Sequence, residues 1–289
     1  MTIYNLGSIN RDLIYQMQRL PQAGETIAAQ EFIEMLGGKG LNQSVAATRA
    51  GADLVHIGAI GKDDRDMRER LQNLGLDTSA IAGVDHPTGH AIVSVDEAGE
   101  NAIVLLQGAN VQQDQDMIKQ SLKNIKDSDF LMLQNETNYQ LLAAQIAYDV
   151  GATVVYSAAP FSATAVEAVL PFVDILVVNT VERQQLSDAL GIGEFDLPVS
   201  TAIITKGAEG ADWIDIKSKV SKATPAMNAE VVDTTGAGDT FIGYVVSGLA
   251  EGLPPDEAMR LGSVAAAIMV SRKGTASAIP TRAEVDARL

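Results

Sequence analysis

The sequence predicts an α/β fold, a three-layer sandwich in which helices cover a central, mainly parallel sheet, with a small β lid beside it. Short runs of β-branched and aliphatic residues alternate with segments of helical periodicity, which is the pattern of βαβ units. These runs lie at residues 3–6, 53–60, 130–133, 153–156, 175–178 and 202–205. With 289 residues, of which 46% are hydrophobic, the chain can bury a large core.

One helix and the strand that follows it illustrate the pattern. The segment from Leu41 to Ala50 has helical periodicity and is followed by Gly51, a residue type that often ends helices. Asp53 then opens the next strand. This order of helix, glycine and strand is what a crossover between parallel strands requires.

Two regions, at about residues 12–36 and 88–106, break the alternation and are predicted as antiparallel hairpins. In the second region the segments AIVSV and AIVLL flank the turn DEAGEN. Together they would form a lid. The sequence shows no repeat or linker, so a single domain spanning residues 1–289 is expected. Exposed lid edges favour pairing with a second subunit, so a homodimer through the lid is expected.

Composition excludes several kinds of partner and site. The formal net charge of −16 argues against nucleic acid, and the absence of an 18-residue apolar stretch argues against a membrane. The chain has no cysteine, and the start of the sequence lacks the pattern of a secretory signal, so a cytoplasmic protein is expected. His56, His86 and His90 have no metal-ligand spacing.

The strongest motif is DTTGAGD at 233–239, between the strand-like Val231-Val232 and an apolar helix that is expected to start near residue 240. Small residues at a helix start leave N–H groups uncovered, and the helix dipole favours an anion there. Asp239 would stand beside a bound phosphate and could accept a proton from a hydroxyl. The alternative is a turn followed by an acidic first helical turn, which stabilises a helix without any ligand.

A second motif is GGKG at 37–40, followed by Asn42. Glycines let the main chain approach a ligand, and an Asn at a helix start can bind hydroxyl groups. The motif is not a nucleotide P-loop, because Gly40 follows Lys39 where that loop has Ser or Thr. The alternative is a hairpin end that leads into a helix.

Other polar residues follow predicted strands. Asn179 and Glu182 lie three apart and could bind phosphate or the waters of a magnesium ion, or they could form a capping box. Asn10, Asp12 and Glu136 follow strands at the edge where α/β folds bind ligands. Each of these residues alone could equally be a solvated loop residue.

Taken in order along the chain, the motifs resemble the ribokinase/PfkB carbohydrate kinase family nearly end to end. The matching segments are GSINRD (7–12), GGKGLNQSVAA (37–47), TGHAI (88–92), GEN with QGAN (99–110), NTVE (179–182), ITKGAEG (204–210), DTTGAGDTF (233–241) and AAAIMVSRKGTASAIP (265–280). The resemblance implies an ATP-dependent sugar kinase with Mg²⁺ and a monovalent cation, K⁺.

The resemblance also implies a role for each matched residue. Asp239 resembles the catalytic base, with Gly236, Ala237 and Gly238 as the anion hole for the transferred phosphoryl group. The residues that match the family's sugar-binding positions, and favour D-ribose, are Asn10, Asp12, Gly38, Lys39, Asn42, Glu136 and Asp239. Those that match the nucleotide-binding positions are Asn179, Thr205, Lys206, Gly207, Ala208, Glu209, Gly210, Gly238 and Ser263. Glu182 matches the magnesium position, and the potassium positions are matched by Asp233, Thr235, Met269, Arg272, Gly274 and Ala278.

The chain departs from the family pattern on what is expected to be the nucleotide side. The segment 157–160 reads Ser-Ala-Ala-Pro where the family usually has Asn-Pro-Ala-Pro, and Ser263 stands where Asn or His often flanks adenine. The stretch between Glu182 and Thr201 is also short for an extra helix. These differences concern adenine specificity and ATP affinity more than the sugar.

Three alternatives remain open at this point. A kinase of the same family could act on another sugar or a nucleoside. A non-catalytic sugar or nucleotide sensor could use the same fold, although the intact Asp239 motif speaks against it. A dinucleotide-dependent dehydrogenase is a weaker alternative, because GSINRD after the first strand is not the G-x-G-x-x-G phosphate loop.

Overall fold

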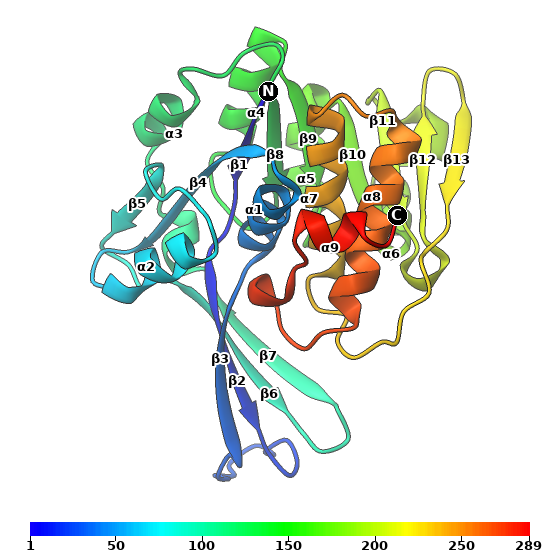
Figure 1. The fold of residues 1–289 in the computed structure, drawn as a ribbon. Helices are drawn as coiled ribbons and strands as arrows, with labels where there is room; N and C mark the ends of the chain where they lie inside the picture. The colour runs from blue at the N-terminus through cyan, green and yellow to red at the C-terminus, as the bar shows by residue number, and fades with distance from the viewer.

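The computed structural model describes the backbone of residues 1–289 and the side chains of all residues but 194. Its main sheet is central and mostly parallel, as predicted (Figure 1). In spatial order its strands are β13 (Val220–Thr224), β12 (Ala211–Asp215), β11 (Thr201–Thr205), β10 (Ile175–Asn179), β9 (Thr153–Ser157), β8 (Phe130–Gln134), β1 (Thr2–Leu6), β4 (Asp53–Gly61) and β5 (Ile81–Val84). Each of the six predicted strands is confirmed to within a residue or two.

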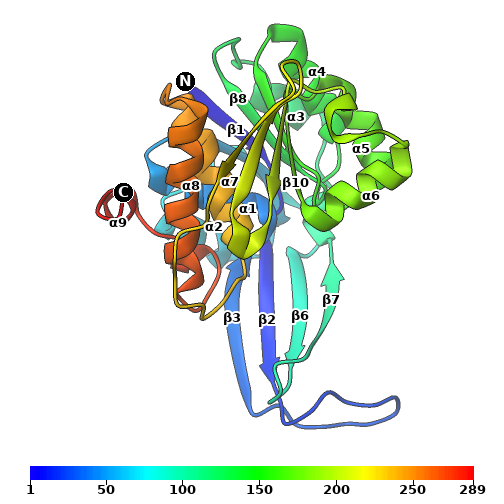
Figure 2. The ribbon, with the colours of Figure 1, turned by 90° about the vertical axis from the view of Figure 1, so that its right-hand side faces the viewer.

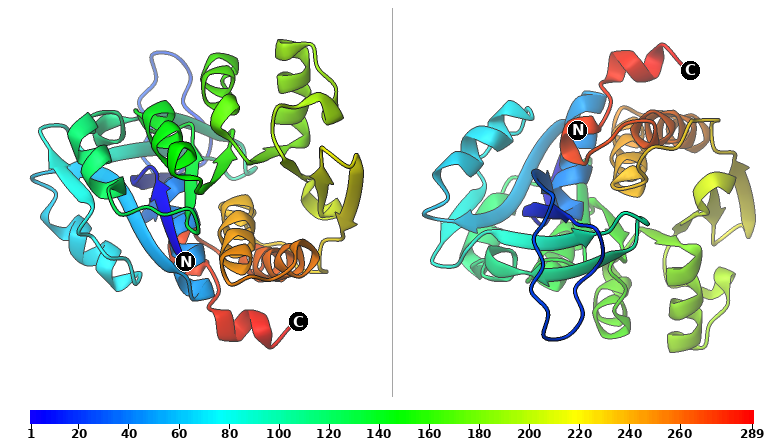
Figure 3. Two further views of the ribbon diagram at one scale, coloured as in Figure 1. Left: turned by 90° about the horizontal axis from the view of Figure 1, so that it is seen from above. Right: turned by 90° about the horizontal axis from the view of Figure 1, so that it is seen from below.

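Helices cover both faces of this sheet, and Figure 3 shows the two groups on opposite sides. One face carries α1 (Lys39–Ala50), α2 (Arg65–Asn73), α7 (Ala237–Ala250), α8 (Pro255–Val270) and α9 (Arg282–Asp286). The other face carries α3 (Gln115–Leu122), α4 (Gln140–Val150), α5 (Ala163–Val169) and α6 (Thr180–Leu190). Within the described chain, no helix combines the length and the apolar character needed to cross a membrane.

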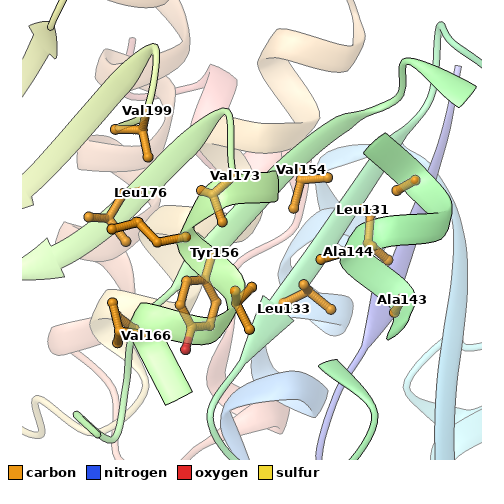
Figure 4. Packing of buried hydrophobic residues seen from close by; sticks show 14 of the residues in the cluster. Leu131, Leu133, Ala143, Ala144, Val154, Tyr156, Val166, Val173, Leu176 and Val199 are labelled. Carbon is orange, nitrogen blue, oxygen red and sulfur yellow. The ribbon is translucent and has the colours of Figure 1, made fainter. Parts of the chain in front are cut away.

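Strand β8 shows how the sequence builds three layers. Alternate side chains of a strand point to opposite faces. Leu131 and Leu133 therefore join the cluster with Ala143 of α4 (Figure 4), whereas Phe130 and Met132 join the cluster beneath α7. Each fully buried side chain of this size contributes about 1.5–3 kcal/mol. A strand that is apolar on both faces is thus held between two helical layers.

The lid is a separate sheet of order β3-β2-β6-β7, which extends from one end of the main body (Figure 2). Its strands are β2 (Asn10–Gln16), β3 (Glu31–Gly37), β6 (Gly89–Val95) and β7 (Asn101–Leu106). Strands β2 and β3 pair antiparallel, as do β6 and β7, which confirms both predicted hairpins. The parallel pairing of β2 with β6 joins the two hairpins.

Two predictions before α7 need correction. Val231 and Val232 are not in a strand but lie exposed in the connection from β13 to α7. Branched side chains favour a strand only where they can pack against neighbours, and this pair has no such surface. The β12–β13 hairpin, in which Lys219 adopts a positive φ of 57°, was not predicted from the sequence.

Candidate active site

The first turn of α7 separates a cavity from a cluster of polar side chains. Gly236 has a φ of 73°, a left-handed conformation that glycine adopts readily, and α7 begins at the next residue. Ala237 and Gly238 line a cavity of about 540 Å³. The Asp239 carboxylate instead accepts hydrogen bonds from Asn42 and Gln43 of α1. Adjacent residues of one helical turn therefore face different sites.

The cavity brings together most of the predicted nucleotide residues. Those that line it are Asn179, Thr205, Gly207, Ala208, Gly210, Gly238 and Ser263. Lys206 and Glu209 are not among its lining residues, and Lys206 Nζ instead lies 2.8 Å from Asp212 Oδ1. One wall comes from α8, through Ser263 and neighbouring Ala and Val side chains, so this part can accept a flat apolar ring.

In the predicted anion hole, one backbone N–H group already has a hydrogen-bond partner. N–H groups in the first turn of a helix have no intrahelical partner, so those of α7 are directed towards the cavity end of the helix. The Ala237 N–H, however, donates to the Thr234 carbonyl at 3.2 Å. A phosphoryl oxygen would share this donor with Thr234, whereas Gly238, the next residue, lines the cavity.

The glycines of the second motif allow α1 to begin against the loop after β1. Gly38 has a φ of 98° and precedes the helix. A Cβ at Gly40 would lie 2.3 Å from the Cα of Gly7, which is closer than real Cβ contacts. Leu41 N–H donates to the Ser8 carbonyl at 2.9 Å. Side chains at these positions would separate the helix start from this loop.

Glu136 fastens the same region from the end of β8. Its Oε2 accepts from the backbone N–H of Lys39 at 2.9 Å and from the Ser8 hydroxyl. Three segments far apart in sequence therefore meet at one carboxylate. The other carboxylate oxygen remains available for a ligand hydroxyl.

Asn42 offers an unpaired acceptor to this site. Its Nδ2 donates to Asp239 Oδ2 at 3.2 Å, but its buried Oδ1 has no hydrogen-bond partner among the described side chains and backbone. A buried carbonyl oxygen without a partner is rare and costs stability. A hydroxyl donor from a bound sugar would satisfy it.

The polar cluster contains three titratable groups with shifted pKa values. Burial raises the pKa of Asp12 to about 6, and the Glu136 charge adds to the effect. Burial also raises the pKa of Asp239, although Lys39, Gln43 and Asn42 oppose the shift. Burial alone would lower the pKa of Lys39, but nearby carboxylates raise it overall. The group thus holds one ammonium among several acids.

Asn10 and Asp12 reach this cluster from the base of the lid. They lie in β2, so they belong to the lid sheet and not to a loop after β1. Asn10 Oδ1 accepts from Asn110 Nδ2 at 2.7 Å, and Asn110 Oδ1 accepts from the Ile9 N–H. This pair fixes the orientation of Asn10. Asn110 therefore holds the start of β2, the strand on which Asn10 and Asp12 lie.

Asn179 and Glu182, the predicted magnesium motif, form the capping box that their spacing also allows. Asn179 Oδ1 accepts from the N–H groups of Val181 and Glu182, and Glu182 Oε2 accepts from the Asn179 N–H at 2.9 Å. The motif still faces the site, because Asn179 lines the cavity and the Glu182 charge acts on Lys39. The box uses Asn179 Oδ1 and Glu182 Oε2, so it leaves Asn179 Nδ2 and Glu182 Oε1 for a ligand.

Asp233 ties two loops together beside the start of α7. Its Oδ1 accepts from the Thr235 N–H at 2.9 Å and its Oδ2 from the Gly274 N–H at 3.3 Å. The carbonyls of Met269 and Ala278 accept hydrogen bonds from Arg272. Carboxylate and carbonyl oxygens are the ligands that hard cations take, and these residues would supply them to an ion only by sharing oxygens that accept hydrogen bonds here.

The departures from the family pattern fall in different places. Ser263 lines the cavity, as expected for a nucleotide-side residue. The segment 157–160 is not among the lining residues, and the Ala159 carbonyl instead accepts from the Asn135 N–H next to Glu136. Between α6 and β11 the chain forms only the 3₁₀ turn Glu194–Asp196.

Two residues of the site were not predicted: Gln43, which contacts Asp239, and Ser8, which contacts Glu136. Gln43 follows Asn42 inside the matching segment 37–47, but nothing in the spacing indicates which way its side chain points. Ser8 was hidden in the same way inside GSINRD.

Comparison with known proteins agrees with this geometry. Residues 2–282 match the pfkB family of carbohydrate kinases. The ribokinase of Haemophilus influenzae is 38% identical, covering 98% of this chain and 96% of that protein. The chain therefore belongs to the pfkB family of carbohydrate kinases.

Solved structures place it beside ribokinases within that family. The ribokinase of Thermotoga maritima has a TM-score of 0.88 and 32% identity, covering 99% of this chain and 98% of that one. The ribokinase of Arabidopsis thaliana, complexed with ribose and ATP, has a TM-score of 0.87 and 27% identity, with 99% and 97% covered.

Proposed function

We propose that the chain is an ATP-dependent kinase that phosphorylates the primary hydroxyl of D-ribose, with residues 1–289 acting as one domain. The observation that carries the proposal is the first turn of α7. Gly238 lines the cavity that suits a nucleotide, and the neighbouring Asp239 contacts Asn42 on the polar side. A phosphoryl donor and a hydroxyl acceptor would meet at this turn.

The residues of the polar cluster then have defined tasks. Asn42 and Glu136 would hold sugar hydroxyls from the main body, and Asn10 and Asp12 would do so from the lid. Asp239 would orient the primary hydroxyl towards the γ-phosphate and take its proton late, because charge in the loose transition state spreads over the phosphoryl oxygens. Backbone N–H groups at residues 236–238 would offset that charge.

Two cations complete the proposal. Asn179 and Glu182 would hold the water shell of Mg²⁺, which neutralises charge on the phosphates of bound ATP. Asp233, with carbonyls of the 269–278 segment, would hold K⁺. The residues that would hold K⁺ would not contact a substrate. They would act by fixing the loop that carries residues 234–238.

The lid suggests a second copy of this chain as partner. Ile103, Val104, Leu105 and Leu106 are all exposed on the edge strand β7, and Phe32 is exposed on β3. Such an apolar edge favours pairing with another lid. We therefore propose a homodimer through the lid, located in the cytoplasm, to be checked by light scattering of the wild type against Val104→Glu.

A coupled assay of ADP release tests the proposed activity across ribose, deoxyribose, fructose and nucleosides. The highest kcat/KM should be found with ribose. A preference for another acceptor would reassign the substrate within the family. Binding of sugar and ATP without any ADP release would instead indicate a sensor.

A further inference from the structure

A chain of buried side-chain amides runs from Asp239 into the interior. Gln43 Nε2 donates to Asp239 Oδ1 at 3.1 Å, and Gln43 Oε1 accepts from Gln134 Nε2 at 2.7 Å. The same Gln134 nitrogen donates to Asn5 Oδ1 at 2.9 Å, and Asn5 Nδ2 donates to the Gly40 carbonyl at 2.8 Å. Asn5, Gln43 and Gln134, here called the amide chain, are each 0% exposed.

The orientation of every amide in this chain follows from one backbone group. The Gly40 carbonyl can only accept, so the nitrogen of Asn5 must face it and the oxygen of Asn5 must face Gln134. Gln134 must then present its nitrogen to that oxygen. The same nitrogen faces Gln43, which must present oxygen there and nitrogen to Asp239.

This arrangement leaves one buried polar atom without a hydrogen bond, which lowers stability and is not required by packing alone. Gln134 Oε1 is buried without a hydrogen-bond partner among the described residues. Turning the Gln134 amide over would bring its oxygen against two carbonyl oxygens, those of Asn5 and Gln43. The unpaired oxygen is therefore the consequence of keeping a donor towards both neighbours, and buried unpaired groups call for an explanation.

We propose that Gln43 is a positioning residue for Asp239 and that Gln134 and Asn5 fix which side of the Gln43 amide faces the carboxylate. Held at Oδ1, the carboxylate keeps Oδ2, on the Asn42 side, for the hydroxyl proton. This inference rests on the proposed role of Asp239 as base. A reversed Gln43 amide would set its oxygen against a carboxylate oxygen and displace the base.

The test compares Gln43→Met and Gln134→Met with Ser44→Ala as the matched control. Ser44 Oγ accepts from Asn5 Nδ2 at 2.8 Å and bonds to His56, but the Gly40 carbonyl still orients Asn5 without it. All three variants remove a buried hydrogen bond and should lower the melting temperature. They differ in whether they remove the contacts that decide which side of the Gln43 amide faces Asp239.

We expect Gln43→Met to lower kcat by about ten- to a hundredfold, the effect of losing a hydrogen bond to a charged group, with unchanged KM for sugar and ATP. Its acidic limb in the kcat–pH profile should move to higher pH, because Asp239 loses a donor that lowers its pKa. Gln134 does not contact the substrate in this proposal. Gln134→Met should lower kcat and move the acidic limb to higher pH, each by less than Gln43→Met does. Ser44→Ala should keep the wild-type kcat and profile.

An unchanged profile in Gln43→Met would overturn the proposal, and so would a shift in Ser44→Ala as large as that in Gln43→Met. If Gln43→Met does not fold, the comparison of Gln134→Met with Ser44→Ala decides alone. Wild-type protein without turnover on any acceptor would count against the proposed function, whereas an active wild type with unaffected variants would count against the amide chain.

Discussion

Asn42 and Asp239 lie 197 residues apart in sequence, yet Asn42 Nδ2 is 3.2 Å from Asp239 Oδ2. The contact joins the start of α1 to the start of α7. The fold itself therefore orients the proposed base. Its remaining requirement is an ionised carboxylate, which burial makes harder to keep as the pH falls.

Replacing Asp239 by Asn should abolish turnover while sugar and ATP still bind, because an amide keeps the shape but cannot accept the proton. Loss of a positioned base costs roughly a hundred- to ten-thousandfold in rate. Single-turnover kinetics and binding calorimetry would measure the two properties separately. A variant that keeps more than about a tenth of kcat would contradict the assignment.

The same variant should melt at a higher temperature than the wild type at neutral pH. The pKa of Asp239 is raised in the folded state, so its ionised form costs stability above that pKa. The cost begins to shrink as the pH falls below the folded pKa and is gone below the unfolded pKa of about 3.8. The difference in melting temperature between Asp239→Asn and the wild type, measured by calorimetry, should therefore be present at neutral pH and vanish at acidic pH. A difference that stays constant with pH would show that the ionised carboxylate does not lower stability.

Asn42→Ala and Glu136→Ala should weaken ribose use far more than ATP use. Each substitution removes a hydrogen-bond partner of the sugar hydroxyls. Leaving these hydroxyls unpaired in the site would weaken sugar binding by an amount of the order of several kcal/mol. Steady-state KM values for both substrates provide the measurement. Asn135→Ala is the control, since Asn135 bonds to Tyr156 and Pro160 next to Glu136. Equal effects on both KM values would place these residues outside the sugar site.

Ribose affinity should fall as the pH drops below about 6, the pKa of Asp12. An ionised carboxylate accepts hydrogen bonds from hydroxyls more strongly than a protonated one, so affinity is full above this pH and declines by up to about tenfold per unit below it. Ribose binding should be measured by calorimetry in the Asp239→Asn variant, which removes the other carboxyl group whose pKa is raised. Adding Asp12→Asn should flatten the dependence, and persistence of the slope would exclude Asp12.

Potassium chloride should raise kcat when compared with choline chloride at equal ionic strength. Fixing the loop around Asp233 would orient the donors of residues 236–238, and one such donor is worth about a hundred- to a thousandfold. Activation should leave both KM values nearly unchanged and should vanish in Asp233→Asn. Equal rates with potassium and choline would leave Asp233 as a tie between Thr235 and Gly274 only.

The sequence predicted the sheet and the lid hairpins because hydrophobic period and turn residues are local signals. It also placed Asp239 correctly in the first turn of a helix. It could not show that Gln43 and Gln134 bond to each other, since they lie 91 residues apart and only folding brings them together. The strand predicted at Val231 and Val232 was wrong for the converse reason. The local β propensity is high there, but both side chains are exposed and have no neighbouring strand to pack against.

The division at α7 has an evolutionary consequence. The proposed acceptor residues all precede position 137, apart from Asp239, whereas the cavity for the phosphoryl donor is lined from residue 179 onward. Variation in the first half of such a gene could therefore change which alcohol is used without altering how the donor is held. A chimera that joins the first half of a relative to the second half of this chain would inherit its acceptor from the relative, with the α1–α7 contact as the junction that must be kept compatible.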